Sequence, residues 1–328
     1  MGAVLELVSD FKSRYENKKI KFQKADFAAH ILFGDMEQYR KDLIHLHIIV
    51  FIYGFTAILG RLIGLHASDL VWYRVLIAFV SLGALMIYRK VSWQLPRISI
   101  IKLIGVGFIV ALHWVSFFHA IKIANISVAL GCLATTTLFT SFLEPLVLRR
   151  RISKLEIFVG VLIIIGLYTI FQFEAHYLAG IVTGLVSAFL AALFTVLNKY
   201  FIRDHHPLAI SFYEMGGGLL IMSLYVLLKH AEGAPFPLPQ GMDYFYLLVL
   251  GTICTAYAYM ASVKVMQSLS AYTVVLTVNL EPVYGIIMAF ILFGESEQMS
   301  GGFYAGTLMI LGAVLLFPVL RRRSFLAH

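Results

Sequence analysis

The chain has 328 residues, of which 60% are hydrophobic and only 13% are charged, and its mean hydropathy is +0.86. Soluble domains carry roughly 45–50% apolar and about 25% charged residues, so this composition excludes an ordinary water-soluble domain. The formal net charge of +8 does not indicate nucleic-acid binding, because the basic residues flank long apolar runs, where positive charge orients membrane helices.

Apolar runs of about 20 residues, each long enough to cross a ~30 Å hydrocarbon core, recur along the chain. Charged or Pro/Gly-rich segments separate them. In chain order the expected helical spans are 44–64, 69–88, 99–121, 126–147, 154–172, 176–198, 207–228, 244–263, 270–292 and 301–320. We therefore predict an all-α integral membrane protein with ten transmembrane helices.

Three of these spans begin with a recognisable helix-start residue. Pro207 suits the first turn of span seven, where its missing N–H is not needed. Ser270 and Ser300 precede spans nine and ten and are expected to act as N-caps.

The distribution of Lys and Arg predicts the orientation of the ten spans. With the N-terminus inside, every basic residue falls on the inner side except Arg61, Arg74, Lys122 and Lys229. Because cytoplasmic loops carry the excess of positive charge, both termini are predicted to be cytoplasmic. The acidic outer segment GESEQMS (294–300) agrees with this orientation.

The two ends of the chain differ from the apolar body. Residues 1–43 are polar and basic and are predicted to form a cytoplasmic extension, with no signal-peptide pattern of a short apolar core and cleavage site. Residues 321–328 are predicted to be a basic cytoplasmic tail.

No cofactor is expected from the motifs of the chain. Cys132 and Cys254 fall inside apolar runs and support neither a disulfide framework nor a metal site. No GxxxxGK[ST] phosphate-binding loop is found, so ATP-driven transport by this chain alone is not expected.

The two halves of the chain resemble each other. VGVLIIIG (159–166) matches AGTLMILG (305–312), and WYRVLIAF (72–79) lies against FYEMGGGL (212–219), which pairs Arg74 with Glu214. Because each half holds an odd number of spans, the second must be inverted relative to the first, as in many secondary transporters. The predicted repeats are 44–172 and 176–320.

These features resemble the EamA-type members of the drug/metabolite transporter superfamily. The resemblance rests on the Arg of WYRVLIAF, on the run LSAYTVVLTVNLEPVYGIIMAFILFGE (269–295), and on the G-x5-G helix that closes each half. The first half departs from the family pattern, since Thr136 stands where the repeat register expects a proline.

The resemblance implies a secondary transporter and not an enzyme, and the lack of a targeting segment in the sequence favours a prokaryotic plasma membrane. The resemblance also implies export of small organic metabolites, such as amino acids or amphipathic compounds, by alternating access around a central cavity. The expected partners are a small-molecule substrate, the lipid bilayer and protons as coupling ion, with no nucleic acid; the oligomeric state stays open.

Span nine carries the most unusual cluster, VNLEPVYG (278–285). A charged group at mid-helix costs about 2.5–3.5 kcal/mol on insertion scales, so Glu281 is expected to face the bundle interior. Pro282 removes a backbone hydrogen bond and loosens the helix beside Asn279. We predict that Glu281, Pro282, Asn279 and Tyr284 lie on the substrate or proton pathway, the alternative being a neutral or paired Glu281 that holds helices together.

Arg74 and Glu214 are further intramembrane charges. Arg74 must find an anion or extend its side chain to the membrane surface, and it could anchor a substrate carboxylate or serve as an interhelical ion pair. Glu214 lies beside three glycines (216–218), which permit close helix approach, and it is a second candidate proton site.

The remaining pathway candidates are His113 and Trp114 in span three, Tyr257 in span eight, and Asn198 with Lys199 at the inner end of span six. A histidine can relay protons near neutral pH, although a buried histidine is commonly a packing residue. Asn198 and Lys199 are interpreted as an inner gate.

Two alternatives stay open at the level of sequence. A nucleotide-sugar or phosphate-ester antiporter would need several basic residues inside the membrane, and only Arg74 is clearly placed there. An intramembrane transferase would need convergent His, Asp or Glu residues, and the paired histidines at 45 and 47 lie on different helix faces.

Overall fold

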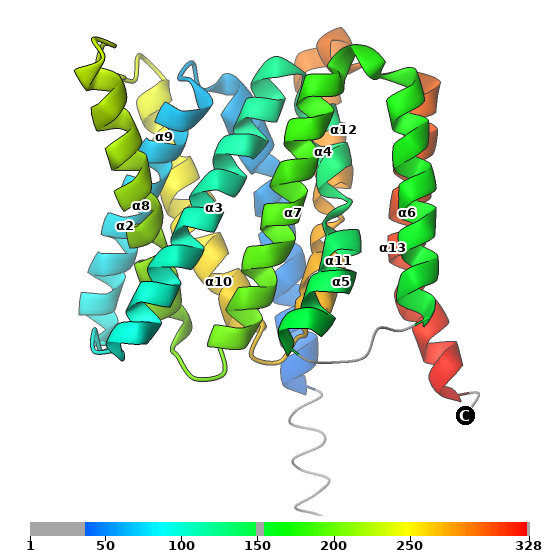
Figure 1. Cartoon of the computed structure of the whole chain (residues 1–328), viewed down its shortest axis with the longest axis horizontal. Helices are drawn as coiled ribbons and strands as arrows, with labels where there is room; N and C mark the ends of the chain where they lie inside the picture. Colours follow the sequence, from blue (N-terminus) through cyan, green and yellow to red (C-terminus); the bar gives the residue numbers. More distant parts are fainter. Residues whose placement is uncertain (1–36, 149–153, 327–328) are drawn as a thin grey trace, which may run out of the picture. The chain divides into compact units, whose positions relative to one another are not determined.

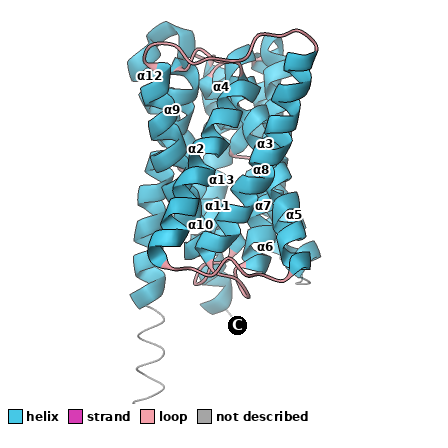
Figure 2. Ribbon diagram, turned by 90° about the vertical axis from the view of Figure 1, so that its left-hand side faces the viewer, coloured by secondary structure: helices cyan, strands magenta, loops and turns pink. Residues whose placement is uncertain are grey.

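A computed structural model describes residues 37–148 and 154–326. The described residues are helical, with short connections and no strand among them (Figures 1 and 2). Most of the predicted N-terminal extension, the basic cluster 149–151 and the last two residues lie outside the described ranges.

The first helix is Glu37–Leu62. It is followed by α2 (Ala67–Arg89), α3 (Arg97–Ile123), α4 (Ile126–Leu133), α5 (Thr136–Leu148), α6 (Lys154–Phe173), η1 (Ala175–Tyr177), α7 (Leu178–Phe201), α8 (Pro207–Ala231), α9 (Asp243–Gly251), η2 (Thr252–Tyr257), α10 (Ala258–Val265), α11 (Ala271–Val278), α12 (Glu281–Phe293), η3 (Gly294–Glu297) and α13 (Gly301–Leu326).

By length and composition, eight helical segments of the described chain could cross a membrane: Glu37–Leu62, Ala67–Arg89, Arg97–Ile123, Ile126–Leu148, Ala175–Phe201, Pro207–Ala231, Asp243–Val265 and Ala271–Glu297. Helices α6 and α13 contain shorter apolar segments, Phe158–Ile170 and Gly301–Ala313. The order of these helices follows the predicted spans, and the first helix begins at Glu37 instead of residue 44.

The predicted helix starts are confirmed. Pro207 occupies the first turn of α8, where no backbone hydrogen bond is lost. The Ser270 hydroxyl accepts from the Thr273 N–H at 3.0 Å, and the Ser300 hydroxyl accepts from the Phe303 N–H at 3.1 Å.

Two predicted spans are broken in the middle. The span expected at 270–292 ends as α11 at Val278 and resumes as α12 at Glu281. Pro282 has no N–H to donate to the carbonyl of Val278, which is the last residue of α11, so the proline accounts for the break. Leu280 instead donates to the carbonyl of Thr277, three residues back, at 3.0 Å.

The span expected at 126–147 breaks at the corresponding place without a proline. Helix α4 ends at Leu133 and α5 begins at Thr136. The Thr135 and Thr136 hydroxyls donate to the carbonyls of Cys132 and Leu133 at 2.7 and 2.6 Å, and side-chain bonds of this kind compete with the helical ladder.

A third irregularity interrupts the span between α9 and α10. Residues Thr252–Tyr257 form η2, a turn of π-helix. The Thr255 hydroxyl donates to the carbonyl of Leu250, five residues back, at 2.6 Å. Such π-turns add one residue to a helical turn and are frequent at functional sites.

Helix α3 lies at the centre of the packing. It contacts both α7 and α8, α8 also contacts α2, and α6 pairs with α13 at one side of the bundle (Figure 1). Glycines bring α3 and α8 into backbone contact. An ideal Cβ on Gly107 would lie 2.0 Å from the carbonyl oxygen of Glu214, and one on Gly217 would lie 2.3 Å from the carbonyl oxygen of Ile104.

Two buried carboxylates bind the starts of helices in the opposite half of the chain. Glu297 accepts from the backbone N–H groups of Ile126 and Ser127 at 3.2 and 3.0 Å. Glu174 accepts from the N–H of Ser300 at 3.0 Å. Both interactions satisfy donors that a helix start leaves unpaired, and negative charge is favourable there.

The α3–α8 contact predicts a large difference between two glycines of the same helix. Gly107→Ala should destabilise the protein by about 1–3 kcal/mol because its methyl group overlaps the backbone of α8. Gly105→Ala is the matched control, since a Cβ there meets nothing within 4 Å. The measurement is thermal unfolding in detergent, and equal melting temperatures for the two variants would contradict the close contact.

Candidate functional site

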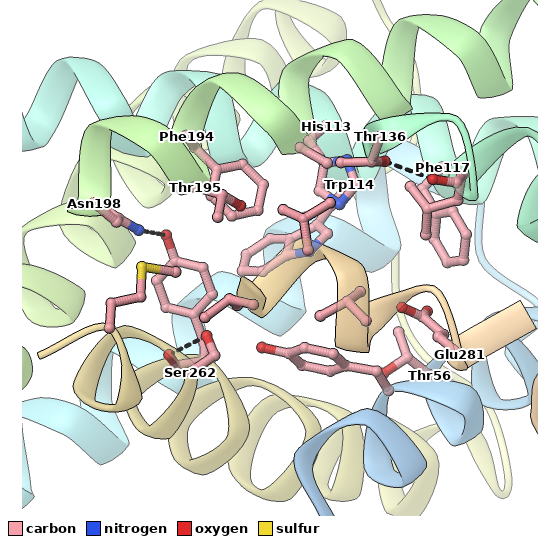
Figure 3. A pocket seen from close by; sticks show the side chains of 18 of the residues that line it. Thr56, His113, Trp114, Phe117, Thr136, Phe194, Thr195, Asn198, Ser262 and Glu281 are labelled. Carbon is pink, nitrogen blue, oxygen red and sulfur yellow. Dashed lines mark hydrogen bonds between the residues drawn. The ribbon is translucent and has the colours of Figure 1, made fainter. Parts of the chain in front are cut away.

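A cavity of about 90 Å³ lies inside the bundle between both halves of the chain. Its polar lining consists of Thr56, Arg74, His113, Thr136, Thr195, Asn198, Ser262 and Glu281. Its aromatic lining consists of Tyr53, Trp114, Phe117, Phe194 and Tyr259. Figure 3 shows Glu281 and Thr56 toward one end and Asn198 toward the other.

Arg74 is buried, with 2% of its surface exposed, so its side chain does not extend to a membrane surface. Its Nε donates to the Thr255 hydroxyl at 2.6 Å, and its guanidinium carbon lies 3.9 Å from the centroid of the Trp114 ring. Cation–π stacking suits a guanidinium because it is planar and weakly hydrated. Among the described residues, Nη1 of Arg74 has no hydrogen-bond partner.

Glu281 is also buried and opens α12 directly after the helix break. It lines the cavity with Arg74, and the ion pairs of the described residues do not include one between them. A carboxyl group and a guanidinium therefore share one small enclosed space without neutralising each other directly.

His113 joins the cavity wall to α7. Its Nδ1 lies 2.9 Å from both the carbonyl oxygen and the hydroxyl of Ser187. Its ring also lies against Phe117 and Phe194, with centroids 6.3 and 5.3 Å away. The histidine is thus held between α3 and α7 by hydrogen bonds and aromatic contacts.

Asn198, Tyr259 and Glu214 form a buried hydrogen-bonded group at the other end of the cavity. The Tyr259 hydroxyl donates to Oε2 of Glu214 at 2.8 Å, and Nδ2 of Asn198 donates to the Tyr259 oxygen at 2.9 Å. Nδ2 of Asn198 also lies 3.5 Å from the same carboxylate oxygen. Asn198 and Tyr259 line the cavity, whereas Glu214 lies behind them with no exposed surface.

The structure places five of the eleven predicted residues in the cavity wall: Arg74, His113, Trp114, Asn198 and Glu281. Glu214 does not line the cavity but accepts a hydrogen bond from Tyr259, which does. The others lie elsewhere, for reasons that differ from one residue to the next.

Pro282 and Asn279 belong to the helix break. Asn279 is buried, and its Nδ2 donates to the hydroxyl of Thr137. The hydrogen bond therefore joins the helix break of the second half to the one in the first half.

Tyr257, Tyr284 and Lys199 do not line the cavity. Tyr257 is 42% exposed and contacts His45 at 2.9 Å, because it ends the π-turn and points away from Tyr259. Tyr284 packs edge-on against Phe51. Lys199 donates to the carbonyls of Met266 and Leu269, beyond the end of α10, at 2.5 and 2.8 Å.

Sequence reasoning missed several lining residues, among them Tyr53, Thr56, Phe194, Thr195 and Ser262. Tyr53 and Thr56 are three residues apart on the first helix, and Phe194, Thr195 and Asn198 occupy one face of α7. This helical spacing was the available signal, but in an apolar span it does not separate a cavity-facing side from a lipid-facing side.

The sequence of the chain matches a known protein family over most of its length. The sequence model of the EamA-like transporter family matches residues 43–172 and again residues 178–318. The chain belongs to the EamA-like transporter family. Members of this family are multi-pass membrane transporters of the drug/metabolite transporter superfamily.

Curated relatives of this EamA-like chain include proteins described as uncharacterized transporters. The inner membrane transporter YicL of Salmonella typhimurium is 28% identical over 44% of this chain and 46% of its own length. A transporter of Archaeoglobus fulgidus is 27% identical over 47% of this chain and 53% of its own. Transporter C22F8.04 of Schizosaccharomyces pombe is 25% identical over 75% of this chain and 66% of its own. The chain thus spans about half the length of the first two.

The fold also resembles a solved one. A protein crystal structure superposes with a TM-score of 0.64 at 17% sequence identity, covering 87% of this chain and 99% of the other. At this identity the similarity concerns the fold of the EamA-like bundle alone.

The hydrogen bond between the two helix breaks can be tested by a double-mutant cycle. Asn279→Ala should destabilise the protein by about 1–3 kcal/mol, because removing one partner leaves the buried Thr137 hydroxyl unpaired. Adding Thr137→Val should cost less than the sum of the single changes. Thermal unfolding gives the three values, with Thr140→Val as control because that hydroxyl bonds within its own helix. Additive effects would show that the two breaks are not coupled.

Proposed function

We propose that this EamA-like protein is a secondary transporter that exports small organic metabolites, amino acids foremost, with protons as the coupling ion. Transport would proceed by alternating access around the central cavity. Export and a plasma-membrane location extend the family resemblance, and the inner-membrane description of YicL supports the location.

We further propose that α6 and α13 cross the membrane with the eight longer segments, giving ten crossings with both termini in the cytoplasm. The two family matches support a repeat of five crossings in each half. The broken helices support it too. The ends of α11 and α12 follow the corresponding ends of α4 and α5 by one constant number of residues. The matched ends are Ile126, Leu133, Thr136 and Leu148 in the first half and Ala271, Val278, Glu281 and Phe293 in the second. Five crossings per half imply that the second repeat is inverted.

The observation that carries the proposed substrate class is the presence of Arg74 and Glu281 in the same cavity. An α-amino acid carries a carboxylate that Nη1 of Arg74 could bind and an ammonium group that the Glu281 carboxylate could bind. Charge-assisted hydrogen bonds of this kind are about twice as strong as neutral ones. A substrate with both charges would also reduce the cost of keeping each protein charge inside the membrane.

The remainder of the cavity suits an apolar or aromatic side chain. Trp114, Phe117 and Phe194 supply ring faces, and Tyr53 and Tyr259 add hydroxyl groups at the edges. The single guanidinium does not favour a nucleotide sugar or phosphate ester, whose several negative charges call for several basic residues among the cavity-lining groups.

The small size of the cavity supports a change of shape during transport. Its volume of about 90 Å³ is well below the roughly 300 Å³ at which ligand sites usually begin. A substrate would therefore widen the cavity as it binds. The two helix breaks, at 134–135 and 279–280, are places where the backbone hydrogen bonds are already interrupted and where such movement costs least.

The proposal is tested by counterflow in proteoliposomes. Labelled amino acids, purine derivatives and small cationic drugs would be offered with and without an imposed pH gradient. Specific exchange of amino acids, increased by the gradient, is expected. Exchange of cationic drugs alone would contradict the assignment of Arg74 as carboxylate anchor, and no exchange by folded protein would contradict the transport proposal.

Arg74→Ala should raise the KM for a transported amino acid by about tenfold or more, because a hydrogen bond to a charged group contributes about 1.5–3 kcal/mol. The same change should affect an amino-acid amide much less, since that compound lacks the carboxylate. Arg97→Ala is the control, because Arg97 is exposed at the start of α3. An unchanged KM in Arg74→Ala would leave the arginine a structural role only.

Glu281→Gln should abolish amino-acid exchange while the protein still folds and inserts, because the amide cannot pair with the substrate ammonium group. Glu295→Gln, at an exposed position after the same helix, should transport normally. Surface expression and melting temperature provide the folding check. Normal exchange by Glu281→Gln would remove this residue from the pathway.

A further inference from the structure

Glu214 is a buried carboxyl group that the proposed substrate site does not use. It has no exposed surface, and its oxygen Oε2 accepts hydrogen bonds from Tyr259 and Asn198. Its other oxygen, Oε1, has no hydrogen-bond partner among the described residues, and neither does Oδ1 of Asn198. Unsatisfied buried polar atoms are uncommon in folded proteins and call for an explanation.

Neither protonation state of Glu214 satisfies every polar atom of its surroundings. The ionised form leaves Oε1 as a buried charged acceptor without a donor, and the protonated form, with its proton on either oxygen, still leaves Oε1 without a partner among the described residues. Burial favours the neutral form of a carboxyl group, whereas the hydrogen bonds from Tyr259 and Asn198 favour the ionised form. Its position therefore suits a group that gains and loses a proton during a cycle.

The neighbouring helices place no neutralising charge on Glu214. On α2 the Arg74 guanidinium is directed to Thr255 and Trp114. On α3 His113 is bonded to Ser187. On α7 and α10 the facing groups are Asn198 and the Tyr259 hydroxyl, while the Lys199 ammonium is bound to carbonyl oxygens.

The surroundings of Glu214 differ between its two sides. On one side the backbone of Glu214 packs closely against α3, since a Cβ on Gly107 would lie 2.0 Å from the Glu214 carbonyl oxygen. On the other side, Tyr259 and Asn198 separate the carboxyl group from the cavity and line that cavity themselves. The Tyr259 hydroxyl is thus the connection between cavity and carboxyl group.

The same tyrosine connects Glu214 to the proposed substrate anchor. The Tyr259 ring packs edge-on against Trp114 with ring centroids 5.8 Å apart, and Trp114 supports the Arg74 guanidinium at 3.9 Å. A continuous series of contacts therefore runs from the carboxyl group of Glu214 through two aromatic rings to the cation.

We propose that Glu214 is the coupling-proton site of this transporter and that Tyr259 links it to the cavity. A proton from cavity water binds the Tyr259 oxygen as the hydroxyl proton passes to Oε2 of Glu214, which leaves a neutral acid and an unchanged tyrosine. The new acid no longer accepts from Tyr259, so the ring can shift against Trp114 and change the support of Arg74. This inference rests on the proposed function and assigns Glu281 to substrate and Glu214 to the proton.

The first test detects the proton site without any transport assay. The chain has three tryptophans, and Trp72→Phe with Trp93→Phe leaves Trp114 as the only one. In this background, confirmed to be folded by its melting temperature, Trp114 fluorescence should change with pH in one transition. Glu214→Gln and Tyr259→Phe should each remove that transition, whereas Tyr257→Phe, the matched control two residues away, should keep it. A transition that persists in Glu214→Gln, or none in the parent, would overturn the proposal.

The second test separates coupling from substrate binding in the full-length protein. In proteoliposomes, Glu214→Gln should exchange labelled phenylalanine like the parent but lose its accumulation in response to a pH gradient. Tyr259→Phe should also lose accumulation in response to the pH gradient, and the double variant should lose no more accumulation than either single variant. Accumulation that follows a Na⁺ gradient and is lost in Glu214→Gln would identify a sodium site instead and overturn the proton assignment. Absence of exchange in the parent protein would count against the proposed function, while the fluorescence result would still decide whether Glu214 is the proton site.

Discussion

A permanently charged guanidinium lies inside an apolar helix bundle, and the packing around the cavity is arranged to accommodate it. Arg74 on α2 is stabilised by the Trp114 ring of α3 and the Thr255 hydroxyl of the π-turn, and among the described residues it makes no direct ion pair. Without the extra residue of that turn, Thr255 would stand at a different angle on its helix. Because Nη1 has no hydrogen-bond partner within residues 37–148 and 154–326, its charge is available to an anion in the cavity.

The two helix breaks reach the same geometry by different chemistry. In the second half Pro282 removes the hydrogen bond that would continue α11 into α12. In the first half threonine hydroxyls bind the last carbonyls of α4. Helix bounds align Thr137 with Pro282 and Thr136 with Glu281, one residue away from the pairing expected from sequence. Only the second half therefore has a carboxyl residue at the break, and this difference makes the cavity chemically asymmetric although the helix bounds of the two halves correspond.

Hydropathy and charge alone predicted most of the architecture. The ten apolar runs coincide with the observed helices and helix pairs. A long apolar run in a membrane must form a helix, because only a helix pairs all the backbone polar groups within the run itself. Arg74 and Glu281 could be singled out for the same reason, since an ionisable residue in an apolar span must face the interior. Pro282 and the helix caps were equally local signals.

Local sequence therefore predicts which residues are too costly to face lipid, and where helices begin, end or break. Which of those residues meet was decided by the tertiary structure. Tyr259 instead of Tyr257 enters the cavity because a π-turn rotates the helix that carries both. Asn279 bonds Thr137 from the other half, and Glu214 lies behind Tyr259, because these contacts depend on helix rotation and on glycine-mediated approach. The hydropathy of one span predicts neither the rotation of its helix nor the approach of a neighbouring helix, since a helix that is apolar on every side has no preferred face.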